Sequence, residues 1–138
     1  MNYKAYVSSR PFGGMMIPVP AQNSCIREYV ANNNGLYIIA DLESSFDECF
    51  HQLFGAISNI DEGDALIMYS STMLPKGKKL NKFLDICSLK NLTLAFVLEN
   101  FSVLGDYSKL INDLEVYELA SLELTELKWN ELSDTYYE

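Results

Sequence analysis

Short apolar runs alternate with helix-like segments through the first hundred residues, and this alternation constrains the fold more than any other feature. The apolar runs fall at residues 3–8, 36–40, 65–69 and 92–98. Between them, apolar residues recur every three to four positions, as on one face of a helix, over about residues 21–32, 45–57 and 79–89. Strands and helices that alternate in this way predict a parallel sheet with helices on both faces.

Local signals support the boundaries of these segments. Pro18 and Pro20 exclude a helix before the first helical segment, and Pro20 can stand just before its start. Ser45, with Glu48 three residues later, predicts the N-cap of the second helix. The continuous apolar run of residues 36–40 is typical of a strand that is covered on both faces.

The pattern weakens after residue 100. A short helix ending near Leu114, an edge strand at residues 116–119 and a last helix at residues 125–133 are all compatible with it. No repeat or low-complexity linker marks a domain boundary. We therefore expect one α/β domain over residues 1–138, with a βαβαβαβ core in residues 1–100 and an acidic extension in residues 101–138. The predicted fold is a three-layer αβα arrangement with a mainly parallel sheet of four to five strands.

The charge is uneven along the chain. The sequence has 10 Lys and Arg against 19 Asp and Glu, a net charge of -9. Residues 1–100 carry ten acids and eight bases, a balance of -2, whereas residues 101–138 carry nine acids and two bases, a balance of -7. This charge predicts no binding to nucleic acid or anionic membranes. The acidic end is either a solvated amphipathic element or a docking surface for a basic protein.

Several other classes of protein are excluded because the sequence lacks their characteristic features. No apolar run approaches the roughly 18–20 residues of a membrane span, and the first residues do not resemble a signal peptide, so we expect a cytoplasmic protein. The three cysteines form no CxxC pair, and His51 is the only histidine. This composition predicts neither a disulfide framework nor a metal site, and no cofactor motif is present.

Polar residues follow the predicted strands, at the edge of a parallel sheet where ligands usually bind. Arg10 is the one cation among them, and its guanidinium suits an anion. A crevice of this kind fits a phosphorylated or polyhydroxylated small ligand. The candidates are Ser9 and Arg10 after the first strand, Glu43 after the second, Tyr69 and Ser70 after the third, Glu99 after the fourth, and Gln22 at the first helix.

Each candidate also has a structural interpretation. Arg10 can pair with Glu43 or Glu99 to hold loops together, and Gln22 can cap its helix. A basic cluster at residues 76–79 stands just before the third helix, where helix N-termini attract phosphate. It lacks the spacing of a P-loop, and we expect a solvated loop there.

The order of these elements resembles the catalytic domain of serine recombinases, in a Tyr-x-x-Ser start, Gln22 opening the first helix and Glu99 ending the fourth strand. That family places an arginine and a nucleophilic serine after strand one and an Asp-Arg-x-x-Arg type cluster after strand three. Here Ser9 and Arg10 stand in the opposite order, and residues 70–75 contain neither Asp nor Arg. The resemblance implies the resolvase-like fold without the recombinase catalytic residues.

A second resemblance covers roughly residues 3–100. The segments Tyr6–Phe12, Ile17–Asn23, Ile26–Tyr29, Met68–Ser70 and Met73–Pro75 resemble the "sporadic carbohydrate cluster" family, small proteins encoded among bacterial surface-polysaccharide genes. The resemblance implies a role in making a capsule or O-antigen. The family's recurrent polar residues match Ser9, Arg10, Gln22, Arg27, Tyr69, Ser70 and Glu99.

The second resemblance implies a protein of surface-polysaccharide biosynthesis, and together with the polar crevice it predicts a sugar phosphate or nucleotide sugar as the ligand. Arg10 would hold the anion, Glu43 and Glu99 would bond sugar hydroxyls, and Tyr69 would pack on a ring. Glu99 is the candidate general acid or base if the protein is an enzyme, which the sequence leaves open. The alternative is a small acidic protein-binding module, and a homodimer could form through Phe50, Phe54 and Trp129.

Overall fold

The computed structural model describes residues 1–43, 49–105, 107 and 110 of the 138-residue chain. The chain divides into two compact units, residues 1–107 and 108–138, and the account below concerns the first. Several predicted features lie outside the described residues, so they stay predictions together with the single-domain organisation. They are the cap formed by Ser45 and Glu48, the short helix near Leu114, the strand at 116–119, the helix at 125–133 and Trp129.

A five-stranded sheet in the order β2-β1-β3-β4-β5 forms the centre of the first unit. The first four strands pair in parallel, as the sequence predicts, and β5 pairs antiparallel with β4. This fifth strand begins one residue beyond the predicted βαβαβαβ core. The strands are β1 (Asn2–Ser8), β2 (Leu36–Glu43), β3 (Ala65–Met68), β4 (Thr93–Phe96) and β5 (Phe101–Leu104).

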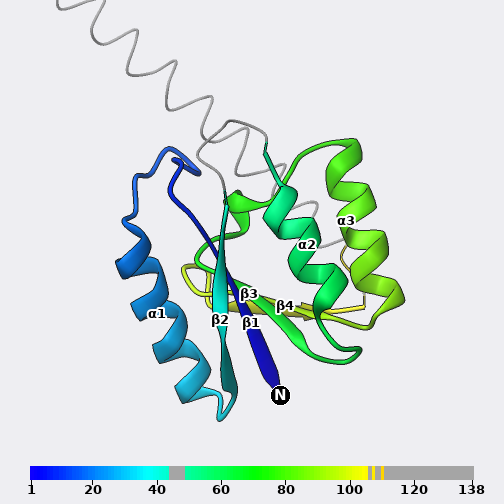
Figure 1. The fold of residues 1–138 in the computed structure, drawn as a ribbon, viewed down its shortest axis with the longest axis horizontal. Coiled ribbons are helices and arrows are strands. Elements are labelled where there is room, and N and C mark those ends of the chain that lie inside the picture. Colours follow the sequence, from blue (N-terminus) through cyan, green and yellow to red (C-terminus); the bar gives the residue numbers. More distant parts are fainter. Residues whose placement is uncertain (44–48, 106, 108–109, 111–138) are drawn as a thin grey trace, which may run out of the picture. The chain divides into compact units, whose positions relative to one another are not determined.

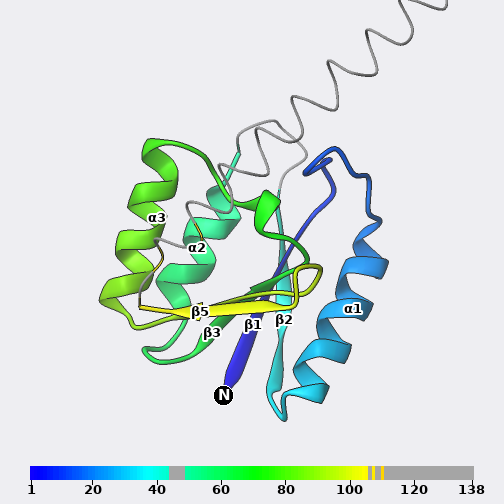
Figure 2. The ribbon, with the colours of Figure 1, turned by 180° about the vertical axis from the view of Figure 1, so that it is seen from behind.

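Among the described residues of the first unit, three α-helices cover the two faces of the sheet. They are α1 (Val19–Asn32), α2 (His51–Asn59) and α3 (Lys78–Leu89), and a 3-10 turn, η1 (Ser71–Met73), follows β3. Helix α1 lies on one face, whereas α2 and α3 lie side by side on the other (Figure 1, Figure 2). The three-layer αβα arrangement with a mainly parallel sheet is therefore confirmed.

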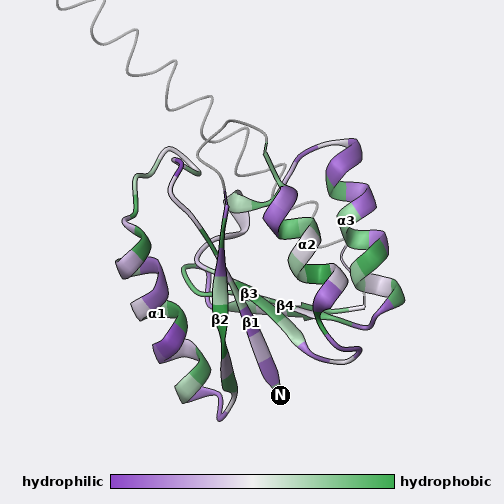
Figure 3. Ribbon diagram, viewed as in Figure 1, coloured by the Kyte–Doolittle hydropathy of each residue, from purple (hydrophilic) through white to green (hydrophobic). Residues whose placement is uncertain are grey.

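Side chains of β1 alternate between the two layers of core. Ala5 and Val7 point toward α1, where they pack in one cluster with Ile26 and Val30 of that helix. Tyr6 takes the opposite face because neighbouring residues of a strand point to opposite sides. That face is closed by fully buried side chains of α2 and α3, among them Leu53, Ile57 and Phe83. The four residues of β3 are hydrophobic throughout, as expected for a strand buried from both sides (Figure 3).

Strand β2 departs from the prediction. Its apolar run was expected to be covered on both faces, but β2 lies at the edge of the sheet and pairs only with β1. Ile39 is 77% exposed and Leu36 is 60% exposed. An apolar run shows that a strand suits burial, but it does not show whether a neighbouring element covers that strand. The expectation of two covered faces is therefore wrong for β2.

Candidate functional site

A basic cleft opens at the carboxyl ends of the strands, the edge at which the sequence predicts a ligand site. It has a volume of about 600 Å³ and is lined by the loop after β1, the segment after β3, the start of α3 and the residue before α2. Its lining includes four cationic and two aromatic side chains. These are Arg10, Lys76, Lys78, Lys79, Phe12 and Phe50. We refer to this cavity as the basic cleft.

Two of these cations lie close to the Phe50 ring. The guanidinium carbon of Arg10 lies 4.4 Å from the ring centroid, and the Lys79 ammonium nitrogen lies 5.8 Å from it. Arg10 also donates a hydrogen bond from Nη1 to the carbonyl oxygen of Cys49. The negative face of the ring stabilises both charges, which otherwise repel each other. Phe50 thus helps to keep positive charge concentrated at the cleft.

The start of α3 adds to the positive potential. Lys78 is the first residue of the helix and Lys79 the second, and no side chain of the described residues caps this end. The first N–H groups of a helix lack intrahelical partners and carry a partial positive charge. Lysine ammonium groups and helix N–H groups therefore point to the same ligand chemistry, an anion such as phosphate.

Gly13 connects the two walls of the cleft. It lies in a tight turn in which Phe12 and Met15 exchange backbone hydrogen bonds of 3.1 Å and 2.9 Å. Its φ of +56° is a conformation that glycine adopts readily. A Cβ placed on Gly13 would stand only 2.8 Å from Oγ1 of Thr72, another residue of the cleft wall. The loop after β1 and the turn after β3 therefore meet at these two residues.

Glu99 and Ser70, both predicted site residues, are bonded to each other behind the cleft. The Ser70 hydroxyl, which is fully buried, donates to Oε1 of Glu99 at 2.7 Å. Ser71 donates to the same oxygen from its backbone N–H and from its hydroxyl, both at 3.2 Å. Neither Glu99 nor Ser70 lines the cleft, but Ser70 contacts Thr72, which does. Glu99 therefore orders the turn after β3.

Glu43 holds the start of α2. Its side chain is buried and accepts hydrogen bonds from the backbone N–H groups of Gln52 and Leu53, at 3.2 Å and 3.1 Å, and from the Tyr6 hydroxyl at 3.0 Å. Burial, together with the nearby carboxylate of Glu43, raises the pKa of the Tyr6 hydroxyl well above its ordinary value. The geometry thus gives Glu43 the role of a helix cap supplied from the end of β2.

Gln22 and Arg27 lie away from the cleft. Gln22 is fully buried, where Oε1 accepts from the Ser8 N–H at 3.2 Å and Nε2 donates to the carbonyl oxygens of Ser8 and Ile17. It therefore fastens α1 to the end of β1. The guanidinium of Arg27 stacks on the Tyr37 ring, 4.5 Å from its centroid.

Ser9 and Tyr69 flank the cleft without lining it. Ser9 is exposed next to Arg10, and the Tyr69 ring packs at a centroid distance of 6.0 Å on that of Phe12. Arg10 is thus the one predicted site residue that the structure places in the lining of the basic cleft.

The lysines are the cleft residues that the sequence analysis did not select. Residues 76–79 were expected to form a solvated loop, yet Lys76, Lys78 and Lys79 all line the cleft. A signal was present, because the cluster follows the third strand and opens a helix, the two positions that place a side chain at the carboxyl edge of the sheet. What the sequence does not show is how closely the loop of Arg10 approaches that cluster.

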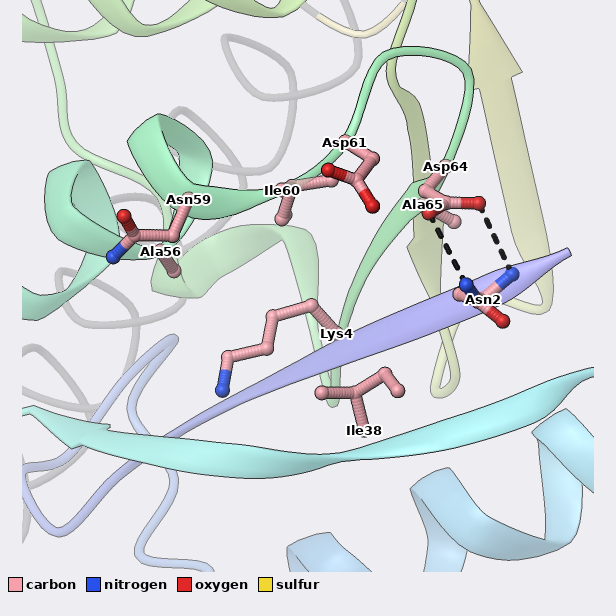
Figure 4. A pocket seen from close by; sticks show the side chains of 9 residues that line it. All are labelled: Asn2, Lys4, Ile38, Ala56, Asn59, Ile60, Asp61, Asp64 and Ala65. Carbon is pink, nitrogen blue, oxygen red and sulfur yellow. Dashed lines mark hydrogen bonds between the residues drawn. The ribbon is translucent and has the colours of Figure 1, made fainter.

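A second, smaller cavity of about 270 Å³ lies near the start of β1 and the end of α2 (Figure 4). Its polar side chains are largely engaged with one another or with backbone. Asn2 donates to both carboxylate oxygens of Asp64, at 3.2 Å and 3.4 Å. The Lys4 ammonium donates to the Ile39 carbonyl oxygen and lies 3.4 Å from the Asp41 carboxylate. We therefore take the basic cleft as the candidate site.

The part of the chain that the structure describes holds neither a candidate metal site nor a helix that could span a membrane. Within it, no group of three or more His, Cys, Asp or Glu residues is arranged to hold a metal ion. Among the same residues, no helix is both long enough and apolar enough to cross a membrane.

Comparisons with known proteins identify the fold. No family model and no curated protein matches the chain significantly. Among solved structures, the N-terminal catalytic domain of TP901-1 integrase matches with a TM-score of 0.52 and 14% identity, over 91% of this chain and 98% of that domain. A resolvase family site-specific recombinase from Streptococcus pneumoniae matches with a TM-score of 0.52 and 15% identity, over 96% and 95% of the two chains. The chain has a resolvase-like α/β fold.

These matches correct the predicted function. A role in surface-polysaccharide biosynthesis, with a sugar phosphate or nucleotide sugar as ligand, is wrong, because the structural neighbours are integrase and recombinase domains. The exclusion of nucleic acid conflicts with the same neighbours. The resemblance to the sporadic carbohydrate cluster family is not supported, and no finding favours the acidic protein-binding module. The resemblance to serine recombinases is confirmed for the fold.

The error about nucleic acid has a physical cause. The prediction used the charge of the whole chain, most of which comes from residues 101–138. A sum over the whole chain does not show the sign of the charge that lines one cavity. Four cations line the cleft, so its local composition differs in sign from that of the chain.

Proposed function

We propose that this protein binds single-stranded DNA and holds the phosphates of the strand in the basic cleft. The observation that carries the proposal is the convergence of Arg10, Lys76, Lys78 and Lys79 on one cavity at the carboxyl edge of the sheet. Phosphate contacts by lysine and arginine dominate the affinity of proteins for nucleic acid. The resolvase-like fold, shared with an integrase and a site-specific recombinase, supports DNA as the ligand.

The size of the cleft favours a single strand. A volume of about 600 Å³ lies within the range of about 300–1,000 Å³ that is typical of small-ligand sites. Such a cavity accommodates one or two nucleotides and not the width of a duplex. Phe50, which is half-buried, adds an apolar surface of the kind that single-strand sites offer to sugars and bases.

The proposal is confined to binding. Ser9 is exposed next to Arg10, but it is not among the described residues that line the cleft. The segment of residues 70–75 contains neither Asp nor Arg to stabilise a reacting phosphate. We therefore assign the cleft the task of holding a strand and attach no strand cleavage to it.

The test is the affinity for a short fluorescein-labelled oligothymidylate, followed by fluorescence anisotropy over a range of KCl concentrations. Each phosphate contact that is lost should flatten the slope of log K against log[KCl] by about 0.7 for a single strand. We expect the double variant Lys78→Ala/Lys79→Ala to bind several-fold more weakly at low salt, with a slope flatter by about 1.4.

Lys82→Ala is the matched control. Lys82 is an exposed lysine of the same helix whose ammonium nitrogen lies 5.6 Å from the Phe54 ring centroid, and it does not line the cleft. This variant should bind nearly as the wild type does. Equal affinities and slopes for the wild type and the double variant would show that DNA binds elsewhere, and an absence of binding by the wild type would overturn the proposal outright.

A further inference from the structure

We infer that Thr72 makes the basic cleft selective for the 3′ end of a DNA strand, by accepting a hydrogen bond from the terminal 3′-hydroxyl. This inference deepens the proposed function and rests on it. It comes from the hydrogen bonds behind the cleft wall, which fix the direction in which the Thr72 hydroxyl donates.

The hydroxyl of Ser70 uses its full hydrogen-bonding capacity. A hydroxyl has one proton to donate and two lone pairs to accept with. The Ser70 proton goes to Oε1 of Glu99 at 2.7 Å, because a carboxylate can only accept. Its oxygen accepts from the Thr72 backbone N–H at 3.2 Å and lies 2.8 Å from Thr72 Oγ1.

The direction of the last bond follows from this count. The single proton of Ser70 is already engaged with Glu99, so the proton between Ser70 and Thr72 must come from Thr72. The Thr72 hydroxyl therefore donates inward, away from the cleft. Its remaining lone pairs are acceptors, and a ligand must supply a donor to bond with them.

Thr72 is placed where a ligand can reach it. It lines the basic cleft and is half-buried, and Gly13 lies against its side chain from the opposite wall. Four cations line the same cavity. The site therefore combines donors for a phosphate with one oriented acceptor, and the ligand that fits it carries an anion and an O–H or N–H group close together.

In the sugar-phosphate backbone of a DNA strand this combination occurs at the end. The internal sugar-phosphate backbone of DNA carries phosphate oxygens and ether oxygens, all of which only accept. A free 3′-hydroxyl supplies a donor one sugar away from the last phosphodiester. An internal ribonucleotide would supply the same chemistry through its 2′-hydroxyl. A free 5′-hydroxyl and the N–H groups of the bases are donors too, so the experiment blocks the 5′ end with the label, keeps the base sequence constant and separates the 3′-hydroxyl from the 2′-hydroxyl.

The test compares oligothymidylates of one length that end in a 3′-hydroxyl, a 3′-deoxy sugar or a 3′-phosphate, each labelled at the 5′ end. A further arm carries one internal ribonucleotide and a 3′-deoxy end. We expect the wild type to bind the 3′-hydroxyl strand about fivefold more tightly than the 3′-deoxy strand, as one neutral hydrogen bond allows. The 3′-phosphate strand adds negative charge to a cleft lined by four cations, so its affinity should fall more steeply with KCl than that of the other two strands.

Two variants assign the preference to Thr72. Thr72→Val keeps the shape of the side chain without its oxygen, and it should bind the 3′-hydroxyl and 3′-deoxy strands equally. Thr72→Ser keeps the hydroxyl and should keep the preference.

Three outcomes overturn the inference. Equal binding of both strands by the wild type, with binding still dependent on Lys78 and Lys79, overturns the end selectivity and leaves the proposed function intact. If the strand with the internal ribonucleotide binds as tightly as the 3′-hydroxyl strand, Thr72 accepts from a 2′-hydroxyl. That result overturns the assignment to the 3′ end. Absence of binding by every strand overturns the proposed function as well.

Discussion

The Tyr6 hydroxyl donates a hydrogen bond of 3.0 Å to the Glu43 carboxylate, and both side chains are buried. Tyr6 lies on β1, the strand next to the edge of the sheet, and Glu43 ends the edge strand β2. The same carboxylate accepts from two backbone N–H groups at the start of α2. One side chain thus joins two strands and a helix, which explains how a charged group is tolerated in the core.

Removing the charge of Glu43 should destabilise the fold. In Glu43→Gln the new amide group donates where the carboxylate accepted, so a buried N–H or the Tyr6 hydroxyl loses its partner. We expect the free energy of unfolding to fall by about 2 kcal/mol, the usual effect of an unsatisfied buried group next to a lost helix cap. Urea denaturation measures it, with the exposed Glu28→Gln as a control that should stay within about 0.5 kcal/mol of the wild type.

Tyr6 should make the stability depend on alkaline pH. Its pKa is raised in the folded protein by burial and by Glu43, whereas in the unfolded chain it keeps the ordinary value of 10.0. The contribution of Tyr6 to the free energy of unfolding is therefore fully present below about pH 10. As the pH rises further, that contribution is lost by about 1.4 kcal/mol per pH unit. Tyr6→Phe lacks the ionisable group, so its unfolding free energy should fall less steeply between pH 10 and 11. Parallel slopes for both proteins would contradict this.

The sequence predicts the sheet well because the strands of the parallel core are short and largely apolar, and each of the first three is followed by a helical period. It predicts the position of the site for the same reason, since the carboxyl edge follows from the topology. The prediction fails where the same residue composition fits two different structural environments. The run of β2 has the composition of a central strand, and the lysines of residues 76–79 have that of a solvated loop. Only the packing of elements distant in sequence separates these alternatives.

Side-chain roles at the strand ends were the least predictable. Gln22, Glu43 and Glu99 are polar residues at the predicted crevice, and their residue types suit ligand binding. The structure uses each of them to bond backbone or hydroxyl groups of a neighbouring segment. A buried polar group needs such partners, and the sequence does not show where those partners lie.

Gly35 should be intolerant of a side chain. A Cβ at this position would stand 2.3 Å from Cε2 of Tyr3, which packs in the core beneath α1. We expect Gly35→Ala to lower the unfolding free energy by about 1–3 kcal/mol, because the ring or the chain has to move. Gly55→Ala is the matched control, since Gly55 lies within α2 and nothing approaches its Cβ within 4 Å. That variant should be more stable by up to about 1 kcal/mol, and thermal unfolding measures both.

Cys87 should react with a thiol reagent more slowly than the other two cysteines. Burial raises the pKa of its thiol to about 12, so very little of the reactive thiolate exists near pH 8. Cys25 and Cys49 are only half-buried. With Ellman's reagent under native conditions, we expect these two to react first and Cys87 to react only at the rate of unfolding. Cys87→Ala should remove the slow phase and leave the faster reactions unchanged, and three equal rates in the wild type would rule out the buried thiol.

The contact between Gly13 and Thr72 should be more important for binding than for stability. Gly13→Ala and Gly14→Ala each place a side chain at positive φ, +56° and +74°, at a similar cost of about 1–2 kcal/mol in stability. The two differ in their surroundings. A Cβ at Gly13 meets Thr72 Oγ1 at 2.8 Å, whereas nothing lies within 4 Å of one at Gly14.

Comparing the two variants therefore isolates the contact from the backbone strain. Both should melt at a lowered temperature, with Gly13→Ala the less stable of the two, and only Gly13→Ala should displace the Thr72 hydroxyl. We expect Gly13→Ala to lose the preference for a 3′-hydroxyl strand over a 3′-deoxy strand in the anisotropy assay, and Gly14→Ala to keep it. If both variants lose the preference to the same extent, the turn as a whole shapes the cleft and the close approach of these two residues has no separate role.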